Sequence, residues 1–154
     1  MIKEIVKSNR NEELTKQLLK IWHTAVISTH TFLTTEDIEK IIPEVQEGIK
    51  QITYLYLYYE GNQILGFMGV ENQKIEMLFI DNDARGQGIG RKLIEFAITT
   101  LKITSVDVNE QNIQGVGFYQ HMGFIIKNRT ELDSEGRPFP ILQLQINNDK
   151  ENNS

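Results

Sequence analysis

The first half of the chain shows two hydrophobic periods in succession. Apolar residues in 2–6 favour a short strand, and from residue 11 to about 28 they recur at every third or fourth position, which predicts a helix with one buried face. We expect Thr35 to cap a second helix, whose apolar stripe reaches residue 49. Pro43 lies inside that stripe and is expected to kink or divide the helix.

From residue 51 the residue types change to those typical of β-strands. Segments 52–59 and 63–70 are rich in β-branched and aromatic residues and flank the turn Glu60-Gly61-Asn62, so they predict a hairpin. Segment 74–80 supplies a further strand. Three neighbouring strands joined by short turns indicate an antiparallel meander.

Helices and strands alternate in the second half. The pattern predicts a helix over about 91–101, a strand over 103–108, a helix over 112–122 and a closing hairpin from 124–130 and 139–146. Strands connected through helices pair in parallel, so this half indicates a parallel or mixed sheet. The predicted class is α+β, with a mixed sheet covered by helices.

Composition narrows the class of protein. The 154 residues are 40% hydrophobic and 24% charged, which is ordinary for a single domain over 1–146, and the polar segment 147–154 looks disordered. The chain has no cysteine, which excludes disulfide scaffolds, thiolate zinc sites and cysteine nucleophiles. Its charged start lacks the apolar stretch of a signal peptide, and no run is long enough to span a membrane. We therefore expect a soluble cytoplasmic protein without a membrane partner.

The charge balance is acidic. The formal net charge is −5 and the isoelectric point is near 5.2. This argues against a nucleic-acid partner, because phosphate binding needs a basic patch. An acidic surface favours a cationic or amine substrate, but a charge of this size also keeps any small domain soluble, so both interpretations stay open.

The segment 85–92, Arg-Gly-Gln-Gly-Ile-Gly-Arg-Lys, is the most informative turn. Alternate glycines between a strand and a helix expose backbone N–H groups at the positive helix end, which is a phosphate-binding geometry, although a tight turn alone also uses glycine. A Walker loop needs Gly-Lys-Ser/Thr, whereas Gly90 is followed by Arg91-Lys92. A dinucleotide fingerprint would place its third glycine at Arg91 or Leu93. Both nucleotide-binding motifs therefore fail at a defining residue.

Arg85-x-x-Gly88-x-Gly90 instead resembles the Arg/Gln-x-x-Gly-x-Gly/Ala signature of the GCN5-related N-acetyltransferases, or GNAT enzymes. The strand at 78–81 and the block from Asn109 to Phe124, with its Gly-Phe-Tyr-x-x-x-Gly-Phe run, are similar to further parts of that family. The likeness spans roughly residues 2–146. It implies an α+β fold (α/β by some schemes) with a largely antiparallel mixed sheet of about six to seven strands, a splayed parallel pair and about four flanking helices.

Two further segments are similar to a small bacterial YjaB-like subgroup of this family. They are Thr29-His30-x-Phe32-Leu33 and the hairpin tip 133–140. In the family these loops surround the acceptor pocket, so the resemblance makes His30 and Phe32 candidates for the substrate site. A histidine at a helix end is more commonly a cap or a structural residue, and that interpretation also stays open.

The resemblance implies an acetyl-CoA-dependent N-acetyltransferase that transfers the acetyl group directly to a primary amine, with no metal. The strand backbone would bind the pantetheine arm of acetyl-CoA, and the glycine turn would hold its pyrophosphate. The residues implied to bind acetyl-CoA are Met77, Leu78, Phe79, Ile80, Arg85, Gly86, Gln87, Gly88, Ile89, Gly90, Arg91, Asn109, Asn112 and Tyr119. Asn109 could instead simply end a strand, and Asn112 could simply cap a helix.

Three residues carry the catalytic predictions. Tyr119 matches the family's general acid, since a phenol of pKa about 10 is protonated at neutral pH and can donate to the departing thiolate. It could also be a core tyrosine beside Phe118. Glu76 and Asp107 are candidate general bases, acting directly or through water, or else solvated polar positions. The absence of cysteine and of a Gly-x-Ser-x-Gly elbow agrees with direct attack by the amine.

The sequence leaves the acceptor open. A peptide N-terminus, a lysine side chain, a polyamine and a small antibiotic-like amine all fit, because variable loops form the pocket. The state of assembly, monomer or homodimer, is equally open. A non-catalytic acyl-CoA-binding or sensing module on the same fold is the alternative to an enzyme.

Overall fold

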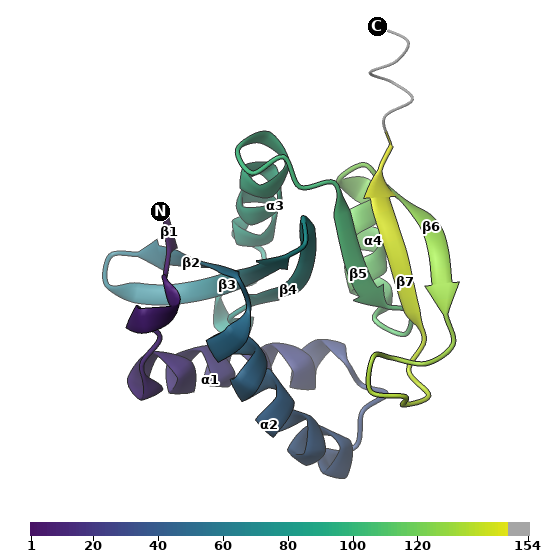
Figure 1. Ribbon diagram of the computed structural model, residues 1–154, viewed down its shortest axis with the longest axis horizontal. Coiled ribbons are helices and arrows are strands. Elements are labelled where there is room, and N and C mark those ends of the chain that lie inside the picture. The colour runs from purple at the N-terminus through teal and green to yellow at the C-terminus, as the bar shows by residue number, and fades with distance from the viewer. Residues whose placement is uncertain (148–154) are drawn as a thin grey trace, which may run out of the picture.

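The computed structural model describes residues 1–147, and a seven-stranded sheet runs through it in the order β1-β2-β3-β4-β5-β7-β6 (Figure 1). The strands are β1 (Ile2–Glu4), β2 (Tyr54–Glu60), β3 (Gln63–Glu71), β4 (Lys74–Ile80), β5 (Ser105–Asn109), β6 (Phe124–Thr130) and β7 (Ile141–Ile146). Every neighbouring pair is antiparallel except β4 and β5, which are parallel. The predicted α+β class with a mixed, largely antiparallel sheet is therefore confirmed.

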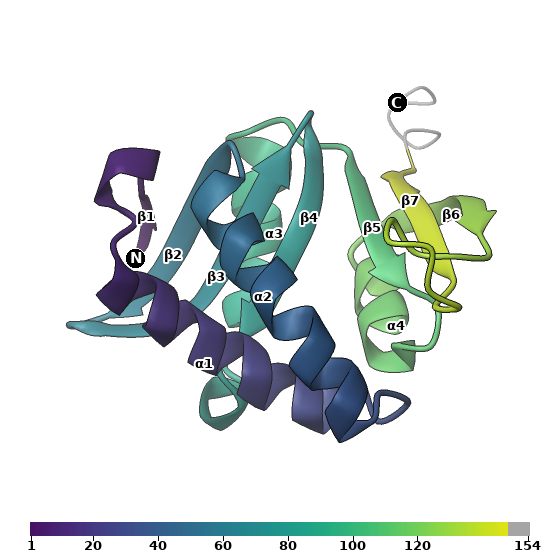
Figure 2. The same ribbon diagram turned by 60° about the horizontal axis from the view of Figure 1, so that its bottom comes forward.

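Four α-helices cover the two faces of the sheet. They are α1 (Glu12–Thr29), α2 (Thr35–Gln51), α3 (Ile89–Thr99) and α4 (Ile113–His121), and short 3-10 turns lie at Lys7–Asn9 and Asn82–Ala84. Helices α1 and α2 lie together on one face, and α3 and α4 lie on the other (Figures 1 and 2). No helix within residues 1–147 has the length and apolar content needed to cross a membrane.

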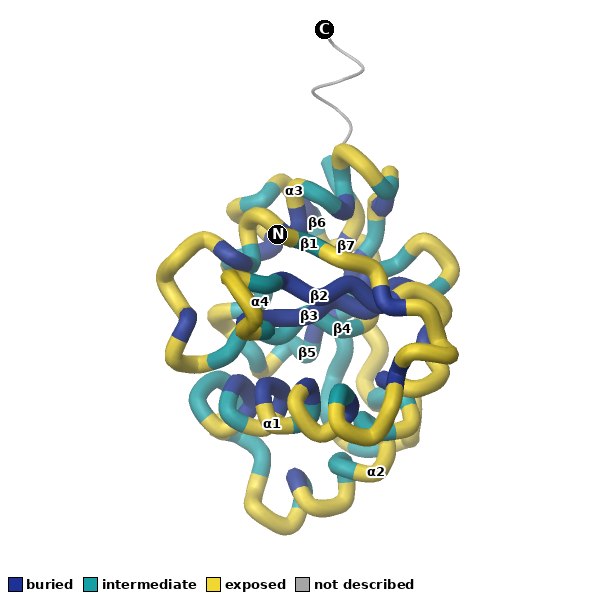
Figure 3. Tube along the Cα trace, turned by 90° about the vertical axis from the view of Figure 1, so that its left-hand side faces the viewer, coloured by how far each residue is buried: buried dark blue, intermediate teal, exposed yellow. Residues whose placement is uncertain are grey.

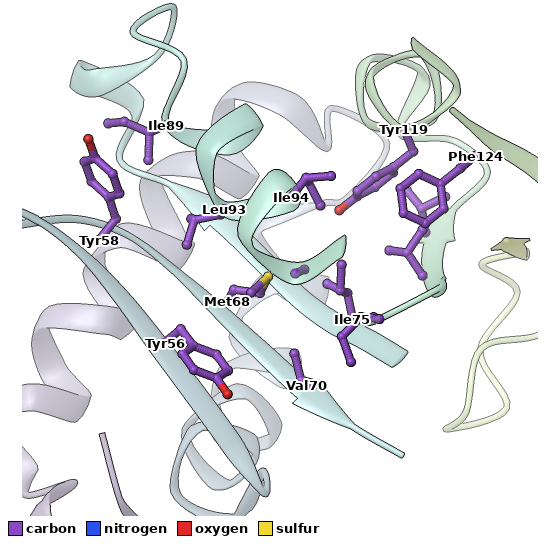
Figure 4. Close-up of a cluster of buried hydrophobic side chains, with 14 of the residues drawn as sticks. Tyr56, Tyr58, Met68, Val70, Ile75, Ile89, Leu93, Ile94, Tyr119 and Phe124 are labelled. Carbon is purple, nitrogen blue, oxygen red and sulfur yellow. The ribbon is translucent and has the colours of Figure 1, made fainter. Parts of the chain in front are cut away.

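The two faces have separate hydrophobic cores. One cluster joins α3, α4 and the strands and contains Leu93, Ile94, Tyr119 and Phe124 (Figure 4). The other joins α1 and α2 to the opposite face of the sheet, and Leu18 is completely buried in it. Figure 3 shows how the buried residues concentrate in β2 and β3, which both cores share.

The start of α2 differs by one residue from the prediction. Thr34, rather than Thr35, is the N-cap, because its hydroxyl accepts from the Asp37 backbone N–H while the Asp37 carboxylate accepts from the Thr34 N–H. This reciprocal pair satisfies two N–H groups that a helix start leaves free. The helix continues through Pro43, so of the two predicted effects of the proline, a kink or a division, the division does not occur. Its apolar stripe packs into one cluster on both sides of the proline, which holds the two halves in one helix.

Other boundaries shift for local reasons. Helix α3 begins at Ile89, earlier than the predicted residue 91, because Gly88 takes a left-handed conformation (φ 77°) and serves as its N-cap. Strand β5 begins at Ser105 rather than at residue 103, since the Ile103 N–H donates to Ala97 at the end of α3. The polar tail was predicted to begin at Asn147, whose N–H donates to Gly123. The rest of that tail, 148–154, lies outside the described residues.

Arg10 ties the two N-terminal helices to the sheet, a role that the sequence did not reveal. The residue is 7% exposed and forms no salt bridge within residues 1–147. Its guanidinium donates to the backbone carbonyls of Ile5, Ile49, Lys50, Ile52 and Thr53. Four of these carbonyls lie at the end of α2 and in the segment before β2, so one side chain satisfies several acceptors that a helix end leaves free.

The parallel pair separates soon after it forms. Strands β4 and β5 pair only at Lys74 with Ser105 and at Ile75 with Val106. Beyond these pairs β4 continues to Ile80 beside β3, while β5 stays paired with β7 through Asn109. The two strands diverge in Figure 1, as the predicted splayed pair required, and the divergence leaves backbone groups of both strands without a strand partner on this side.

Candidate active site

A cavity of about 730 Å³ opens where β4 and β5 diverge. Its walls also include the start of α4, the end of α1 and the loop between β6 and β7. The predicted site residues that line it are His30, Glu76, Leu78, Phe79, Ile80, Arg85, Gly90, Asp107, Asn109, Asn112 and Tyr119. Residues from five separate stretches of the sequence therefore meet at one site.

The other predicted site residues lie outside the cavity wall: Phe32, Met77, Gly86, Gln87, Gly88, Ile89 and Arg91. Two of these have side chains that pack into the core: Met77 packs against the α1–α2 cluster, and Ile89, the first residue of α3, is 2% exposed. They can face a ligand only through their backbone. Gly86 and Gly88 have positive φ angles of 83° and 77°, so both positions favour glycine for conformational reasons.

The start of α3 has unpaired backbone donors. No side chain caps this helix, and the Lys92 N–H makes its first internal hydrogen bond, to Gly88. The N–H groups of Ile89, Gly90 and Arg91 have no hydrogen-bond partner within residues 1–147. The first turn carries no acidic residue, and three free N–H groups at a positive helix end suit an anion.

Three cations surround this helix start, and each has a partner. The Arg85 guanidinium donates to the Gln114 side chain at 2.6 Å and lines the cavity. Arg91 contacts His121 and Glu95. The Lys92 ammonium donates to the Tyr58 hydroxyl at 3.2 Å and lies 5.6 Å from the centre of that ring. Of the three, Arg85 is the one that borders the cavity.

Tyr119 is both a core residue and a cavity residue. It is 7% exposed on α4 and packs edge-to-face on Phe124, with ring centres 5.8 Å apart (Figure 4). Its hydroxyl has no hydrogen-bond partner within residues 1–147, although the residue lines the cavity. Burial raises the pKa of the phenol well above its usual value. Tyr119 therefore remains a proton donor at any physiological pH.

The two candidate bases differ in their surroundings. The Lys74 ammonium donates to Asp107 Oδ2 at 3.1 Å, whereas Asp107 Oδ1 is buried without a hydrogen-bond partner. Glu76 forms no ion pair within residues 1–147 and remains open to the cavity. Partial burial raises the pKa of Glu76, and the negative charges of Asp107 and Glu71 raise it further while Lys74 opposes them. Glu76 is thus readier to hold a proton than an ordinary glutamate.

The two asparagines have local structural roles and also line the cavity. The Asn109 side chain accepts from the Gln111 N–H, and the Asn112 side chain accepts from the Gly115 N–H as the N-cap of α4. A Cβ atom at Gly115 would overlap the Asn112 side chain. The glycine is therefore required by the cap that Asn112 makes.

The far end of the cavity lies between two loops. His30 ends α1, and its ring centre is 5.4 Å from that of Phe32, which is in turn 5.9 Å from Phe139 in the β6–β7 loop. Burial lowers the pKa of His30 to about 4, so the ring is neutral. Arg137 pairs with Asp133 and with Glu44 on α2, which attaches the same loop to the second helix.

The sequence missed several residues of the cavity wall. Among them are Thr29, Gln114, Leu132, Asp133, Ile141 and Gln143. Asp133 lies in the hairpin tip that was expected to border the acceptor pocket, so its region, though not its side chain, was anticipated. Within residues 1–147, no three histidine, aspartate or glutamate side chains lie close enough together to hold a metal ion.

Comparisons with known proteins agree with this geometry. A family model described as an acetyltransferase (GNAT) domain matches residues 10–140. The peptidyl-lysine N-acetyltransferase YjaB of Salmonella typhimurium is 37% identical over 139 residues, which cover 90% of this chain and 95% of that protein. The solution structure of apo-form YjaB from Escherichia coli matches with a TM-score of 0.83 and 36% identity, over 94% of this chain and 95% of that chain.

A more distant structure has the same fold. PaiA N-acetyltransferase from Thermoplasma acidophilum, solved in complex with coenzyme A, matches with a TM-score of 0.62 and 17% identity, over 94% of this chain and 99% of that chain. The predicted likeness to the YjaB-like subgroup is confirmed by the two YjaB matches. The family match spans most of the chain, from before α1 to the residue before β7. The chain therefore belongs to the GNAT family of N-acetyltransferases.

Proposed function

We propose that this protein transfers the acetyl group of acetyl-CoA to the side-chain amine of a lysine in a peptide or protein. The observation that carries the proposal is the meeting of three features at one cavity: the diverging backbones of β4 and β5, the uncapped start of α3, and Tyr119 with Glu76. The YjaB relative of Salmonella typhimurium is named a peptidyl-lysine N-acetyltransferase, which supports lysine as the acceptor. A cytoplasmic location belongs to the same proposal.

The unpaired backbone of β4 beyond Ile75 offers donors and acceptors in strand geometry to the amide groups of the pantetheine arm. The free N–H groups of Ile89, Gly90 and Arg91 then face the pyrophosphate, with the helix dipole and Arg85 adding positive potential. Asn109 and Asn112 lie along the same wall, where their amide groups can contact the arm.

The charges at the acceptor end favour an amine. Glu76, Asp107 and Asp133 are the carboxylates in the cavity wall, and His30 is neutral. Asp107 is paired with Lys74, and Asp133 accepts from Arg137 and from two backbone N–H groups. Glu76 is the carboxylate of the three that forms no ion pair or hydrogen bond within residues 1–147, so a lysine ammonium entering this end gains most from approaching Glu76.

Direct transfer removes two protons from the lysine ammonium and supplies one proton to the departing sulfur. A lysine amine has a pKa of about 10.4, so at pH 7 its deprotonation costs about 4 to 5 kcal/mol, and Glu76 accepts that proton directly or through water. The neutral nitrogen attacks the thioester carbonyl and forms the amide bond as the carbon–sulfur bond breaks. Tyr119, whose environment keeps its proton in place until then, donates that proton to the departing sulfur. The second proton of the attacking nitrogen leaves as the amide forms and passes through water to the Tyr119 phenolate.

The test is acetylation of a lysine peptide with a blocked N-terminus, followed by mass spectrometry and by CoA release. We expect wild-type protein to add one acetyl group per lysine, and Tyr119→Phe to lower kcat by roughly a hundredfold or more while keeping its affinity for acetyl-CoA within about threefold. Tyr56→Phe is the matched control, because Tyr56 is equally buried but lies outside the cavity wall. It should leave both values unchanged.

Two results would count against the proposal. If wild-type protein binds acetyl-CoA and acetylates no amine, the chain is a binding or sensing module and not an enzyme. If Tyr119→Phe turns over as fast as wild type, Tyr119 is a core residue and another group protonates the thiolate.

A further inference from the structure

The contacts of Thr29 determine which nitrogen of His30 carries a hydrogen. Thr29 Oγ1 lies 2.7 Å from the Ala25 carbonyl oxygen and 2.7 Å from His30 Nδ1. The hydroxyl has one hydrogen, and a carbonyl cannot donate, so that hydrogen goes to Ala25. The hydrogen in the second contact must then belong to Nδ1. A neutral ring has one N–H, so His30 Nε2 is a bare acceptor.

Nε2 is also available to a ligand. It has no hydrogen-bond partner within residues 1–147. Among those residues Asp107 Oδ1 is the only side-chain nitrogen or oxygen that lacks a partner and is also sealed from solvent, so His30 Nε2 is not sealed. His30 lines the cavity and its Nε2 is not sealed from solvent, and from these two observations we infer that the open edge of the ring faces the cavity. Thr29 holds one side of the ring and Phe32 packs beside it with the ring planes tilted by 44°, which fixes the direction in which Nε2 points.

A fixed, neutral acceptor has a definite chemical preference. It binds N–H or O–H donors and cannot donate to an acceptor, in contrast to a histidine that is free to change tautomer. It also carries no positive charge that would repel an ammonium group. Among the carboxylates on the same wall, Asp133 is paired with Arg137 and Asp107 Oδ2 with Lys74, while Asp107 Oδ1 is sealed from solvent. Glu76 is the remaining carboxylate and takes the proton.

We propose that Nε2 of His30 accepts a hydrogen bond from the acceptor amine and thereby positions the lysine nitrogen beside Glu76. This inference rests on the proposed function and adds the residue that orients the amine. Removal of the ammonium proton stays with Glu76, whose carboxylate is the better proton acceptor of the two. His30 holds a second hydrogen of the same nitrogen, which leaves the lone pair free for the thioester.

Two variants separate this role from simple packing. In His30→Asn the side-chain amide stays near the position of Nδ1 and keeps the contact with Thr29, but nothing occupies the position of Nε2. In His30→Gln the longer side chain brings an oxygen to the position of Nε2 and gives up the Thr29 contact. We expect His30→Asn to raise KM for the lysine peptide by roughly tenfold or more, with KM for acetyl-CoA unchanged, and His30→Gln to stay within about threefold of wild type.

Either of two kinetic results would overturn the inference. If His30→Asn keeps the wild-type KM for the peptide, Nε2 makes no contact with the amine. If His30→Gln is as impaired as His30→Asn, the ring matters for packing against Phe32 and not for its acceptor nitrogen.

A nuclear magnetic resonance measurement tests the premise without relying on turnover. Long-range proton–nitrogen correlations on nitrogen-15-labelled protein distinguish the tautomers of its three histidines, and His30→Asn assigns the His30 signals. We expect a protonated Nδ1 and a bare Nε2 whose resonance moves when lysine peptide is added in the presence of CoA. Acetylation without any change at Nε2 would overturn this inference alone, whereas absence of acetylation by wild type would overturn the proposed function.

Discussion

Replacing Arg10 with methionine should destabilise the protein strongly, although Arg10 forms no salt bridge within residues 1–147. The guanidinium donates to five backbone carbonyls, and its bonds to Ile5, Ile49 and Ile52 are buried. Methionine has a similar length and fills the same space, so the change removes the donors with little loss of packing. The buried carbonyls are then left without partners.

The magnitude follows from those three bonds. Each buried carbonyl that loses its partner costs about 1 to 3 kcal/mol, while relief of the buried positive charge returns part of that cost. A net loss of about 3 kcal/mol in the free energy of unfolding is expected, which lowers the melting temperature by roughly 6 to 12 °C for a domain of this size.

The assay is urea denaturation followed by circular dichroism and by tryptophan fluorescence, and Trp22 is the only tryptophan. Arg129→Met is the matched control, because Arg129 makes a two-pronged contact with Glu110 but is 45% exposed. That pair should contribute less than about 1 kcal/mol. A loss below 1 kcal/mol in Arg10→Met, or equal losses in the two variants, would refute the assignment of Arg10 as the residue that ties α2 to the sheet.

Two further variants test the site itself. Glu76→Gln should lower kcat/KM for the lysine peptide by roughly a hundredfold. Because the pKa of Glu76 is raised, wild-type activity should fall as the pH drops through that raised value, and this fall should be absent in the variant. The control Glu71→Gln, outside the cavity wall, should keep near-normal activity. An unchanged pH profile in Glu76→Gln would assign the base elsewhere. Gly115→Ala should destabilise α4 by about 1 kcal/mol despite alanine's better helix propensity, because the new Cβ displaces the Asn112 cap, and a variant more stable than wild type in urea denaturation would contradict that conflict.

The elements that local pattern controls were predictable from the sequence. The segments flanking Glu60-Gly61-Asn62 are rich in β-branched and aromatic residues, and the observed β2 and β3 differ from the prediction by two residues or fewer at each end. The cap of α2 was assigned one residue late, because Thr34 and Thr35 are adjacent and the Asp37 carboxylate decides between them. The divergence of β4 from β5 came from the family resemblance and not from residue pattern.

The sequence predicted many of the residues that line the cavity, but not the partners of its charged side chains. Tyr119, Glu76 and Asp107, which the family resemblance named, all line one cavity. The Lys74 partner of Asp107 is 33 positions away, and only the folded sheet brings the two together. The same holds for Arg137 with Glu44 and for Arg10 with the end of α2. These contacts join segments far apart in the sequence, and local hydrophobic periodicity does not predict which distant residues meet. Thr29 and His30 are adjacent, but the helix carbonyl of Ala25 must also be in position before the tautomer is determined.

The most direct test of the account is calorimetric titration of acetyl-CoA into wild-type protein, Gly90→Asp and Gly90→Asn. Gly90 is the second residue of α3, and a Cβ there would meet Phe118 at an ordinary 3.5 Å, so both side chains fit. An aspartate suits the positive start of a helix, which keeps the variant folded, but it repels a diphosphate. Two like unit charges about 5 Å apart, at an effective dielectric constant of about 40, repel each other by about 1.7 kcal/mol, which weakens binding more than tenfold.

The account predicts micromolar binding by wild type, and binding at least tenfold weaker in Gly90→Asp than in the isosteric Gly90→Asn. Absence of acetyl-CoA binding by folded wild-type protein, or equal affinities in the two variants, would contradict the claim that the cavity between β4 and β5 holds acetyl-CoA with its pyrophosphate at the start of α3.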